Sequence, residues 1–165
     1  MISQRVLRST ARSLLQAGSS YAERDRNPVN GLIDKSALNN NSSVNGSAIC
    51  LLDDDPSVLK ATGRLLSSAG REVQSFTDPH AFLNYAQTQH PRLAILDMLM
   101  PLMHGLDVQR RLQNVSPATR VIILTSKDDP FVRSQAMEAG AAGFFLKPVN
   151  DEEFLSGVDA ILAKN

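Results

Sequence analysis

The chain has 165 residues, of which 42% are hydrophobic, and this is enough for one ordinary domain with a buried core plus an extension. Its formal net charge of zero argues against direct binding of nucleic acid by bulk electrostatic attraction, and no apolar stretch approaches the roughly 20 residues that span a bilayer. The single cysteine, Cys50, excludes an intrachain disulfide and fits a reducing compartment, so we expect a cytoplasmic protein.

The first 46 residues differ in composition from the rest of the chain. They contain six Lys or Arg and three Asp or Glu, whereas the remaining residues contain eleven and fourteen. The polar stretch NNNSSVNGS at 39–47 has the composition of a linker, which places the domain boundary near Ser47. The first 22 residues contain three arginines and no acid, so a transit peptide, a disordered basic tail and a start codon assigned too far upstream all stay open. We expect residues 1–46 to be a disordered basic extension and residues 47–165 to be one folded domain.

Apolar runs and helix-forming segments alternate five times after the linker. In chain order they predict a strand at 48–52, a helix at 56–70, a strand at 72–76, a helix at 78–89, a strand at 93–97, a helix at 106–113, a strand at 120–125, a helix at 130–140, a strand at 142–147 and a helix at 151–164. Most of the predicted strands are continuous apolar runs, which is typical of strands covered on both faces. The alternation predicts an α/β fold in which helices cover both faces of a parallel sheet.

Charged and polar side chains follow four of the predicted strands. The first strand ends at Asp53–Asp55, the third at Asp97, the fourth at Thr125 and the fifth at Lys147. Because the carboxyl ends of parallel strands meet at one edge of a sheet, we expect these side chains to converge there. Two carboxylates about 4 Å apart repel by roughly 4 kcal/mol at an effective dielectric of 20, and a Mg²⁺ ion held by carboxylate oxygens and waters removes that cost. A metal, a lysine and a hydroxyl around one carboxylate are the groups that hold a phosphoryl group.

The same residues resemble the receiver domain of two-component response regulators, over roughly residues 49–162. The resemblance rests on the pair Asp53-Asp54, on Asp97 followed by Met100, Pro101 and Gly105, on Thr125, and on Lys147-Pro148. Each of these is a weak signal alone, whereas their joint order and spacing is specific. The resemblance implies a doubly wound, flavodoxin-like (βα)5 fold whose five-stranded parallel sheet has the strand order 2-1-3-4-5.

The resemblance also implies a role for each site residue. Asp97 is implied to be the phosphoacceptor, which takes a phosphoryl group from a phosphohistidine of a partner. Asp54, Asp97 and the backbone carbonyl of Leu99 are implied to bind Mg²⁺ directly, and Asp53 to bind it through water. Lys147 is implied to contact a phosphoryl oxygen. An apolar residue at the position of Leu99 is expected to give a longer-lived phosphoryl group than a polar residue would.

A switch is implied as well. Thr125 is implied to move toward the phosphoryl group, and Phe144, three residues before the lysine, to turn inward with it. This movement is expected to change the surface formed by about residues 130–163. Phe144 and Phe145 are neighbours on one strand, so they should face opposite sides of the sheet. The Lys147-Pro148 bond is expected to be cis.

The implied partners are other proteins of a phosphorelay. They are a histidine kinase or a histidine phosphotransfer protein upstream and a target protein downstream, with phosphorylation-dependent dimerisation as a further option and no direct contact with nucleic acid or membrane. Because the sequence ends after the last predicted helix, it resembles stand-alone receivers, although DPHAFL and QAMEAGA are closest to receivers that carry a helix-turn-helix output domain. On this interpretation the chain is not an enzyme and catalyses only its own phosphorylation and dephosphorylation.

Two other functions stay open. Asp53, Asp55 and Ser57 approximate the nucleophile motif of haloacid-dehalogenase-like Mg²⁺ phosphatases, but that family needs a further acidic motif after the lysine and would leave Asp97 unexplained. The other alternative is a receiver-like module that binds partners without being phosphorylated. Cys50 lies in the first predicted strand and is expected to be buried and unreactive.

Overall fold

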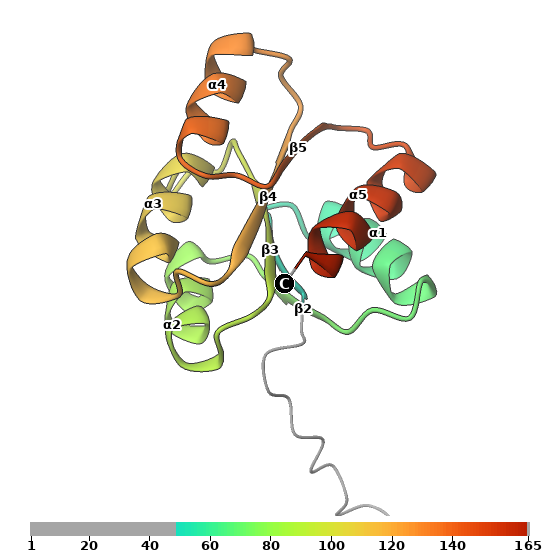
Figure 1. Ribbon diagram of the computed structural model, residues 1–165, viewed down its shortest axis with the longest axis horizontal. Coiled ribbons are helices and arrows are strands. Elements are labelled where there is room, and N and C mark those ends of the chain that lie inside the picture. Colours follow the sequence, from blue (N-terminus) through green and yellow to red (C-terminus); the bar gives the residue numbers. More distant parts are fainter. Residues whose placement is uncertain (1–48, 165) are drawn as a thin grey trace, which may run out of the picture. The chain divides into compact units, whose positions relative to one another are not determined.

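Five parallel strands and five helices make up residues 49–164, the part of the chain that the computed structural model describes (Figure 1). The strands are β1 (Ile49–Leu52), β2 (Val73–Phe76), β3 (Leu93–Asp97), β4 (Arg120–Thr125) and β5 (Gly143–Leu146). The helices are α1 (Pro56–Ser68), α2 (Pro79–Gln89), α3 (Gly105–Val115), α4 (Pro130–Glu138) and α5 (Asp151–Ala163). All ten predicted elements are confirmed, with small differences at their ends. The extension expected at residues 1–46 lies outside the described residues.

The sheet has the strand order β2-β1-β3-β4-β5, as predicted. Every neighbouring pair is parallel, and the register places Ile95 of β3 opposite Leu51 of β1 and Ile122 of β4. The chain leaves β1 toward one edge of the sheet and then returns to build β3, β4 and β5 on the other side of β1. The carboxyl ends of β1 and β3 therefore lie at the point where the strand order reverses, which is where sheets of this kind bind ligands.

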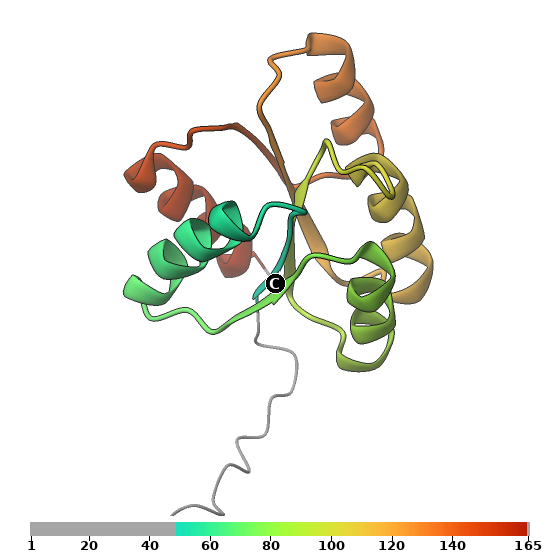
Figure 2. The ribbon, with the colours of Figure 1, turned by 180° about the vertical axis from the view of Figure 1, so that it is seen from behind.

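Helices cover both faces of the sheet (Figures 1 and 2). α1 and α5 lie on one face, and α2, α3 and α4 lie on the other. Alternate residues of β3 serve the two sides: Leu93 and Ile95 pack with α1 and α5, whereas Ala94 and Leu96 pack toward α2 and α3. This two-sided burial explains why the central strands are continuous apolar runs. No helix within residues 49–164 combines the length and the apolar composition that a bilayer crossing requires.

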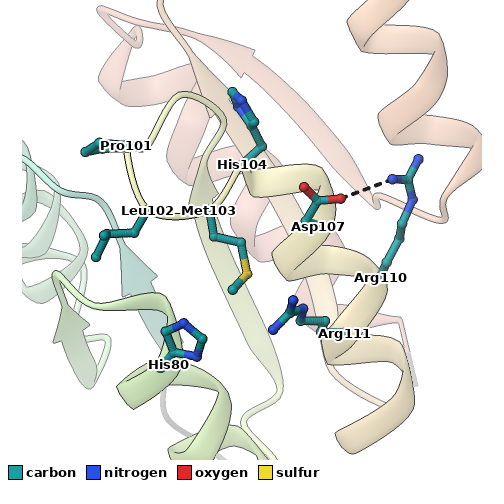
Figure 3. Close-up of a pocket in the computed structure, with 8 residues that line it drawn as sticks. All are labelled: His80, Pro101, Leu102, Met103, His104, Asp107, Arg110 and Arg111. Carbon is teal, nitrogen blue, oxygen red and sulfur yellow. Dashed lines mark hydrogen bonds and ion pairs between the residues drawn. The ribbon is translucent and has the colours of Figure 1, made fainter.

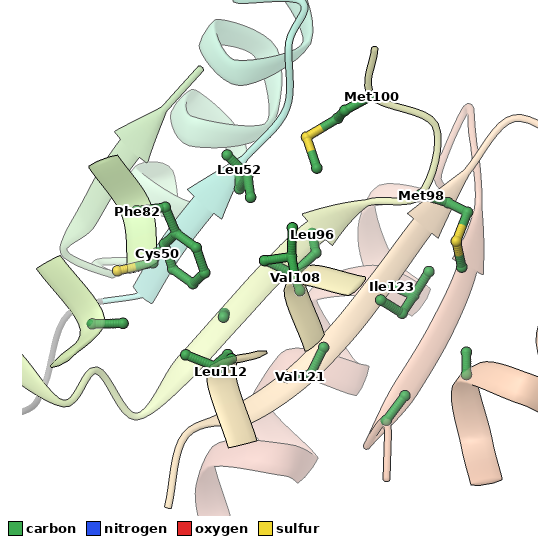
Figure 4. Close-up of a cluster of buried hydrophobic side chains, with 14 of the residues drawn as sticks. Cys50, Leu52, Phe82, Leu96, Met98, Met100, Val108, Leu112, Val121 and Ile123 are labelled. Carbon is green, nitrogen blue, oxygen red and sulfur yellow. The ribbon is translucent and has the colours of Figure 1, made fainter. Parts of the chain in front are cut away.

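Figure 4 shows the core between the sheet and the helices α2 and α3. Phe82 and Leu112 come from these helices and pack against β1, β3 and β4 with almost no exposure. Burial of such a side chain contributes about 1.5–3 kcal/mol. Cys50 lies in the same core, and its burial raises the pKa of the thiol to about 12. The prediction that Cys50 is buried is confirmed, and a thiol that stays neutral is a poor nucleophile.

Aspartates begin three of the five helices. Asp55, Asp78 and Asp129 are the N-caps of α1, α2 and α4, and each carboxylate accepts a hydrogen bond from a backbone N–H of the first turn. A proline follows each of them at the first helical position, where no intrahelical N–H bond is lost. α3 differs, because its N-cap residue His104 makes no such side-chain bond. These caps fix the points at which the loops of the carboxyl edge enter the helices.

Candidate functional site

The carboxyl edge of the sheet brings together residues from four neighbouring strands. Asp53 directly follows β1, Asp97 is the last residue of β3, Thr125 is the last residue of β4 and Lys147 directly follows β5. These strands are adjacent and parallel, so their carboxyl ends lie at the same edge. The convergence predicted from the sequence is therefore confirmed.

Lys147 bridges two buried carboxylates. Its Nζ lies 2.5 Å from Oδ2 of Asp53 and 2.5 Å from Oδ1 of Asp97. Both aspartate side chains are 7% exposed, and the lysine side chain is 20% exposed. The backbone N–H of Lys147 donates to the carbonyl oxygen of Thr125 at 2.7 Å, so the end of β4 helps to position the lysine. The three groups form one cluster in which two negative charges share one positive charge.

The cluster keeps Lys147 protonated. Burial by itself lowers the pKa of an ammonium group, because it disfavours the charged form. The hydrogen bonds to Asp53 and Asp97 and the negative charges of both carboxylates outweigh burial here, so the pKa of Lys147 lies above its ordinary value. At neutral pH the lysine is therefore a positive charge fixed beside the carboxylate of Asp97.

The backbone holds the second oxygen of each carboxylate. The N–H of Leu99 donates to Oδ2 of Asp97 at 2.7 Å, and the N–H of Asp55 donates to Oδ1 of Asp53 at 2.9 Å. Both carboxylates therefore have a defined orientation before any ligand binds. A nucleophile that is oriented in advance lowers the entropic part of a reaction barrier.

Gly105 closes the loop that follows Asp97. The N–H of Gly105 donates to the carbonyl oxygen of Met98 at 3.0 Å. A Cβ atom at position 105 would lie 2.4 Å from the backbone oxygen of Asp97, which is too close for any other residue. Glycine is needed here because two chain segments approach each other closely. The glycine thus fixes the loop against the backbone of Asp97.

The donor set at this edge suits a hard divalent cation. Asp53 and Asp97 already share one cation, the ammonium of Lys147, and Asp54 stands exposed beside them. Mg²⁺ in proteins takes one or two carboxylates and completes its shell with waters and other oxygens. Among residues 49–164 no three side chains of the His, Cys, Asp or Glu type are placed to hold a metal together. The two carboxylates fit a Mg²⁺ ion whose remaining ligands are waters and other oxygens.

Thr125 and Phe144 lie close to the edge and are both buried. The hydroxyl of Thr125 accepts a hydrogen bond from the N–H of Lys127 at 3.2 Å. Phe144 packs in the core shared with α2, α3 and α4, and the guanidinium carbon of Arg133 lies 5.1 Å from the centre of its ring. Phe145 packs on the opposite side, with its ring centre 5.4 Å from that of Phe154, so the prediction of opposite faces is confirmed. Phe144 is thus the one of the two that connects the sheet to α4.

Sequence reasoning did not find Arg133 as a partner of this site. The arginine lies on α4, and its contact with Phe144 depends on how that helix packs over β5. No spacing rule along the chain relates the two residues. The Lys147-Pro148 peptide bond is cis, as predicted.

The structure gives the pattern Asp53-x-Asp55-x-Ser57 a structural explanation. Asp55 is the N-cap of α1, and its Oδ1 accepts the hydrogen bond from the N–H of Ser57 at 2.7 Å. Asp53 is bound to Lys147 instead of lying open to a substrate. The phosphatase alternative therefore loses the residues on which it depended.

Comparison with known proteins assigns the chain to the family that the residues at the carboxyl edge of the sheet indicate. The family model of the response regulator receiver domain matches residues 49–159. This chain belongs to the response regulator receiver family. A receiver domain is the phosphoacceptor module of a two-component system, and domains of this family generally bind Mg²⁺ at the phosphorylation site and do not act on a separate substrate.

Named relatives and solved structures agree with this assignment. The chain is 38% identical to the response regulator protein TodT of Pseudomonas putida over 120 residues, which are 73% of this chain and 53% of TodT. It is 35% identical to TmoT of Ectopseudomonas mendocina over 132 residues, which are 80% of this chain and 58% of TmoT. A CheY-like receiver domain from Methanospirillum hungatei superposes with a TM-score of 0.67 at 25% identity and covers 71% of this chain and 94% of that one. The BeF3-activated DrrB receiver domain gives a TM-score of 0.64 at 30% identity and covers 72% and 99%.

The receiver domain accounts for most of the described residues. The chain spans about half the length of the curated relatives that it matches. The similarity to these relatives therefore concerns their receiver domains and does not extend to the activity of the whole proteins.

Proposed function

We propose that Asp97 accepts a phosphoryl group from a phosphohistidine of a histidine kinase or a histidine phosphotransfer protein. The observation that supports this most is the placement of Asp97 in the cluster with Lys147 and Asp53, at 2.5 Å from the ammonium. A lone carboxylate at a sheet edge could serve any structural purpose. A carboxylate whose two oxygens are oriented by a lysine and by a backbone N–H is prepared for in-line attack on phosphorus.

In the proposed transfer, an Oδ atom of Asp97 forms the new bond to phosphorus while the bond from phosphorus to the donor imidazole nitrogen breaks. The imidazole leaves with the electron pair of that bond, and the product is an acyl phosphate. Lys147 then faces the phosphoryl oxygens with an ammonium group that is already protonated and already in place. The chain catalyses only this transfer and the later hydrolysis of its own acyl phosphate.

Asp54, Asp97 and the backbone carbonyl of Leu99 are the groups that would hold Mg²⁺, with Asp53 acting through water. The ion would supply positive charge opposite the negative charge of the phosphoryl group. Asp53 has a second function that needs no metal, because its Oδ2 accepts a hydrogen bond from the same ammonium of Lys147 that Asp97 contacts. The loss of Asp53 should therefore weaken both cation sites at once.

The groove along α1 offers a place for the donor protein. A hollow of about 760 Å³ lies beside Lys147 and Pro148, with an apolar wall that includes Val58, Ala61 and Leu65 of α1. A donor histidine has to reach Asp97 at the carboxyl edge, and this groove adjoins that edge. Apolar burial along the groove would hold the donor during transfer.

The proposed output is a change in the surface formed by residues 130–163. Thr125 and Phe144 connect the site to α4, since Phe144 stacks under Arg133. Phe131 in α4 is 70% exposed, and Met137 is also exposed on the same helix. These exposed apolar residues of α4 would form a contact surface for a downstream protein or for a second receiver domain.

Mass spectrometry of the full chain after incubation with acetyl phosphate and Mg²⁺ tests the phosphoacceptor assignment. The wild-type chain should gain one phosphoryl group, and the gain should vanish with chelator and in Asp97→Asn. Asp107→Asn is the matched control, because it makes the same change on the exposed surface of α3 and should leave the gain intact. If wild type gains nothing, the chain is a receiver that works by binding alone and the proposal is wrong.

A further inference from the structure

A second hollow, of about 550 Å³, lies between α2, the loop after β3 and the start of α3 (Figure 3). Pro101, Leu102 and Met103 of the loop form its apolar side. Leu102 is 72% exposed, more than any other large hydrophobic residue in the described part of the chain. We call this hollow the α2–α3 groove. Its apolar side is available for contact with another molecule.

The rest of the groove is basic. His80 comes from α2, His104 is the N-cap of α3, and Arg110 and Arg111 lie in the middle of α3, whereas Asp107 is the only acidic residue of the lining. Asp107 is paired with Arg110 at 3.2 Å, which leaves the charge of Arg111 in excess. In Figure 3 the side chains of His80 and Arg111 point into the gap between the two helices.

The basic charge of the groove contrasts with the domain around it. Residues 47–165 contain fourteen acidic and eleven basic residues, so the domain as a whole repels an acidic partner. A local basic groove on such a domain favours docking of an acidic partner at that place over the acidic parts of the surface.

The loop that carries the apolar side has a fixed shape. Gly105 binds back to the carbonyl oxygen of Met98, and the side chains of Met98 and Met100 are buried in the core. The groove is thus formed before any ligand arrives, which reduces the entropy lost on binding.

We propose that the α2–α3 groove binds a segment of a partner protein in which acidic side chains flank a bulky apolar side chain. The apolar side chain would pack against Leu102 and Met103, and a carboxylate of the segment would pair with Arg111. This surface is separate from residues 130–163 and from the α1 groove. Binding requires no phosphoryl group, so it stands or falls independently of the phosphoacceptor role of Asp97.

The test uses the full, unphosphorylated chain and a short fluorescein-labelled peptide of Glu, Leu and Ser, with binding followed by fluorescence anisotropy. Two control peptides carry Lys in place of Glu, or Ser in place of Leu. Arg111→Glu and Leu102→Ser should each weaken binding of the Glu-Leu peptide by about fivefold or more. Lys164→Glu makes the same charge change as Arg111→Glu at an exposed position outside the groove and should have little effect. Shifts in amide NMR signals should fall on residues 80 and 102–111.

Any of the following outcomes would overturn the proposal. One is equal binding of the peptide without Leu, which would mean simple attraction of anions. Another is amide shifts confined to other elements, or no binding of the Glu-Leu peptide at millimolar concentration. The last is tighter binding of a single-stranded DNA oligonucleotide than of the peptide, which would assign the groove to nucleic acid.

Discussion

The side-chain amide of Gln109 in α3 donates a hydrogen bond to the carbonyl oxygen of Ala139, 2.9 Å away at the end of α4. The same amide nitrogen donates to the carbonyl oxygen of Ala136 at 3.2 Å, and Gln113 also donates to Ala139. α4 is a short helix with a single fully buried residue, Ala136, so apolar burial holds it only weakly. The buried Gln109 therefore contributes much of the attachment of α4, and the exposed Gln113 adds less. This helix is also the one that contacts Phe144 through Arg133.

Replacing Gln109 should loosen α4. Gln109→Ala removes two hydrogen bonds, one of them buried, and leaves a cavity, so we expect the free energy of unfolding to fall by about 2 kcal/mol. In Gln109→Ala the backbone amides of α4 should exchange with deuterium faster than in wild type, whereas those of α2 should exchange at the wild-type rate. Gln113→Ala is the matched control, because Gln113 is exposed and its loss should cost less than about 1 kcal/mol. Equal exchange rates in α4 of wild type and Gln109→Ala would show that α4 is held by other contacts.

Two glycines offer a sharper comparison. Gly105→Ala places a Cβ 2.4 Å from the backbone oxygen of Asp97, so the loop has to shift and we expect a loss of about 2 kcal/mol or more in unfolding free energy. Gly63 lies inside α1, where the nearest atom to a new Cβ is 3.8 Å away. Gly63→Ala should therefore stabilise the domain by about 0.5–1 kcal/mol. Urea titration of the three proteins measures both effects, and a neutral Gly105→Ala would mean that the loop adapts without cost.

The sequence was sufficient for the order of elements and for the residues at the carboxyl edge, because both depend on local patterns. Apolar runs predicted the strands, and the residues after them had to meet at one edge once the sheet was parallel. The carboxylate that pairs with Lys147 beside Asp97 could not be predicted in this way. Asp53 and Asp54 are adjacent in the chain, and only the direction in which each side chain leaves β1 decides that Asp53 binds the lysine. The contacts of Gln109 and Arg133 likewise join different elements, α3 with α4 and α4 with β5, so no local pattern could reveal them.

Lys147 makes the stability of the domain depend on pH in a defined direction. Its pKa in the folded chain lies above the ordinary value of about 10.4, so the folded state binds its proton more tightly than the unfolded state. The stability gained from this interaction is fully present below the pKa of lysine in the unfolded chain. It is lost as the pH rises through the higher pKa of Lys147 in the folded chain. Lys147→Met should cost about 2 kcal/mol at pH 8, because two buried carboxylates then lack their shared cation.

The difference between wild type and Lys147→Met should shrink as the pH rises above about 10.5. Unfolding in urea at several pH values between neutrality and the alkaline range measures it. Lys60→Met is the control, because Lys60 is exposed on α1 and its loss should make little difference at any pH. A difference that stays constant with pH would mean that the lysine acts through packing and not through its charge.

Leu99 should set the lifetime of the phosphorylated state, a prediction that rests on the proposed phosphorylation of Asp97. Leu99 is 38% exposed, and its backbone N–H donates to Oδ2 of Asp97 at 2.7 Å, so position 99 is both open to water and next to the carboxylate that would carry the phosphoryl group. An amide in its place can hydrogen-bond and orient an attacking water. Leu99→Asn should then speed hydrolysis by about fivefold, which corresponds to roughly 1 kcal/mol in the barrier.

The decay of the phosphorylated mass after removal of acetyl phosphate measures this rate. Leu102→Asn makes the same chemical change three residues further along the same loop, where the side chain is more exposed and belongs to the α2–α3 groove. It should decay at the wild-type rate, because its side chain lies away from Asp97 on the wall of that groove. Faster decay in both variants would point to a general loosening of the loop, and unchanged decay in Leu99→Asn would remove Leu99 from the control of hydrolysis.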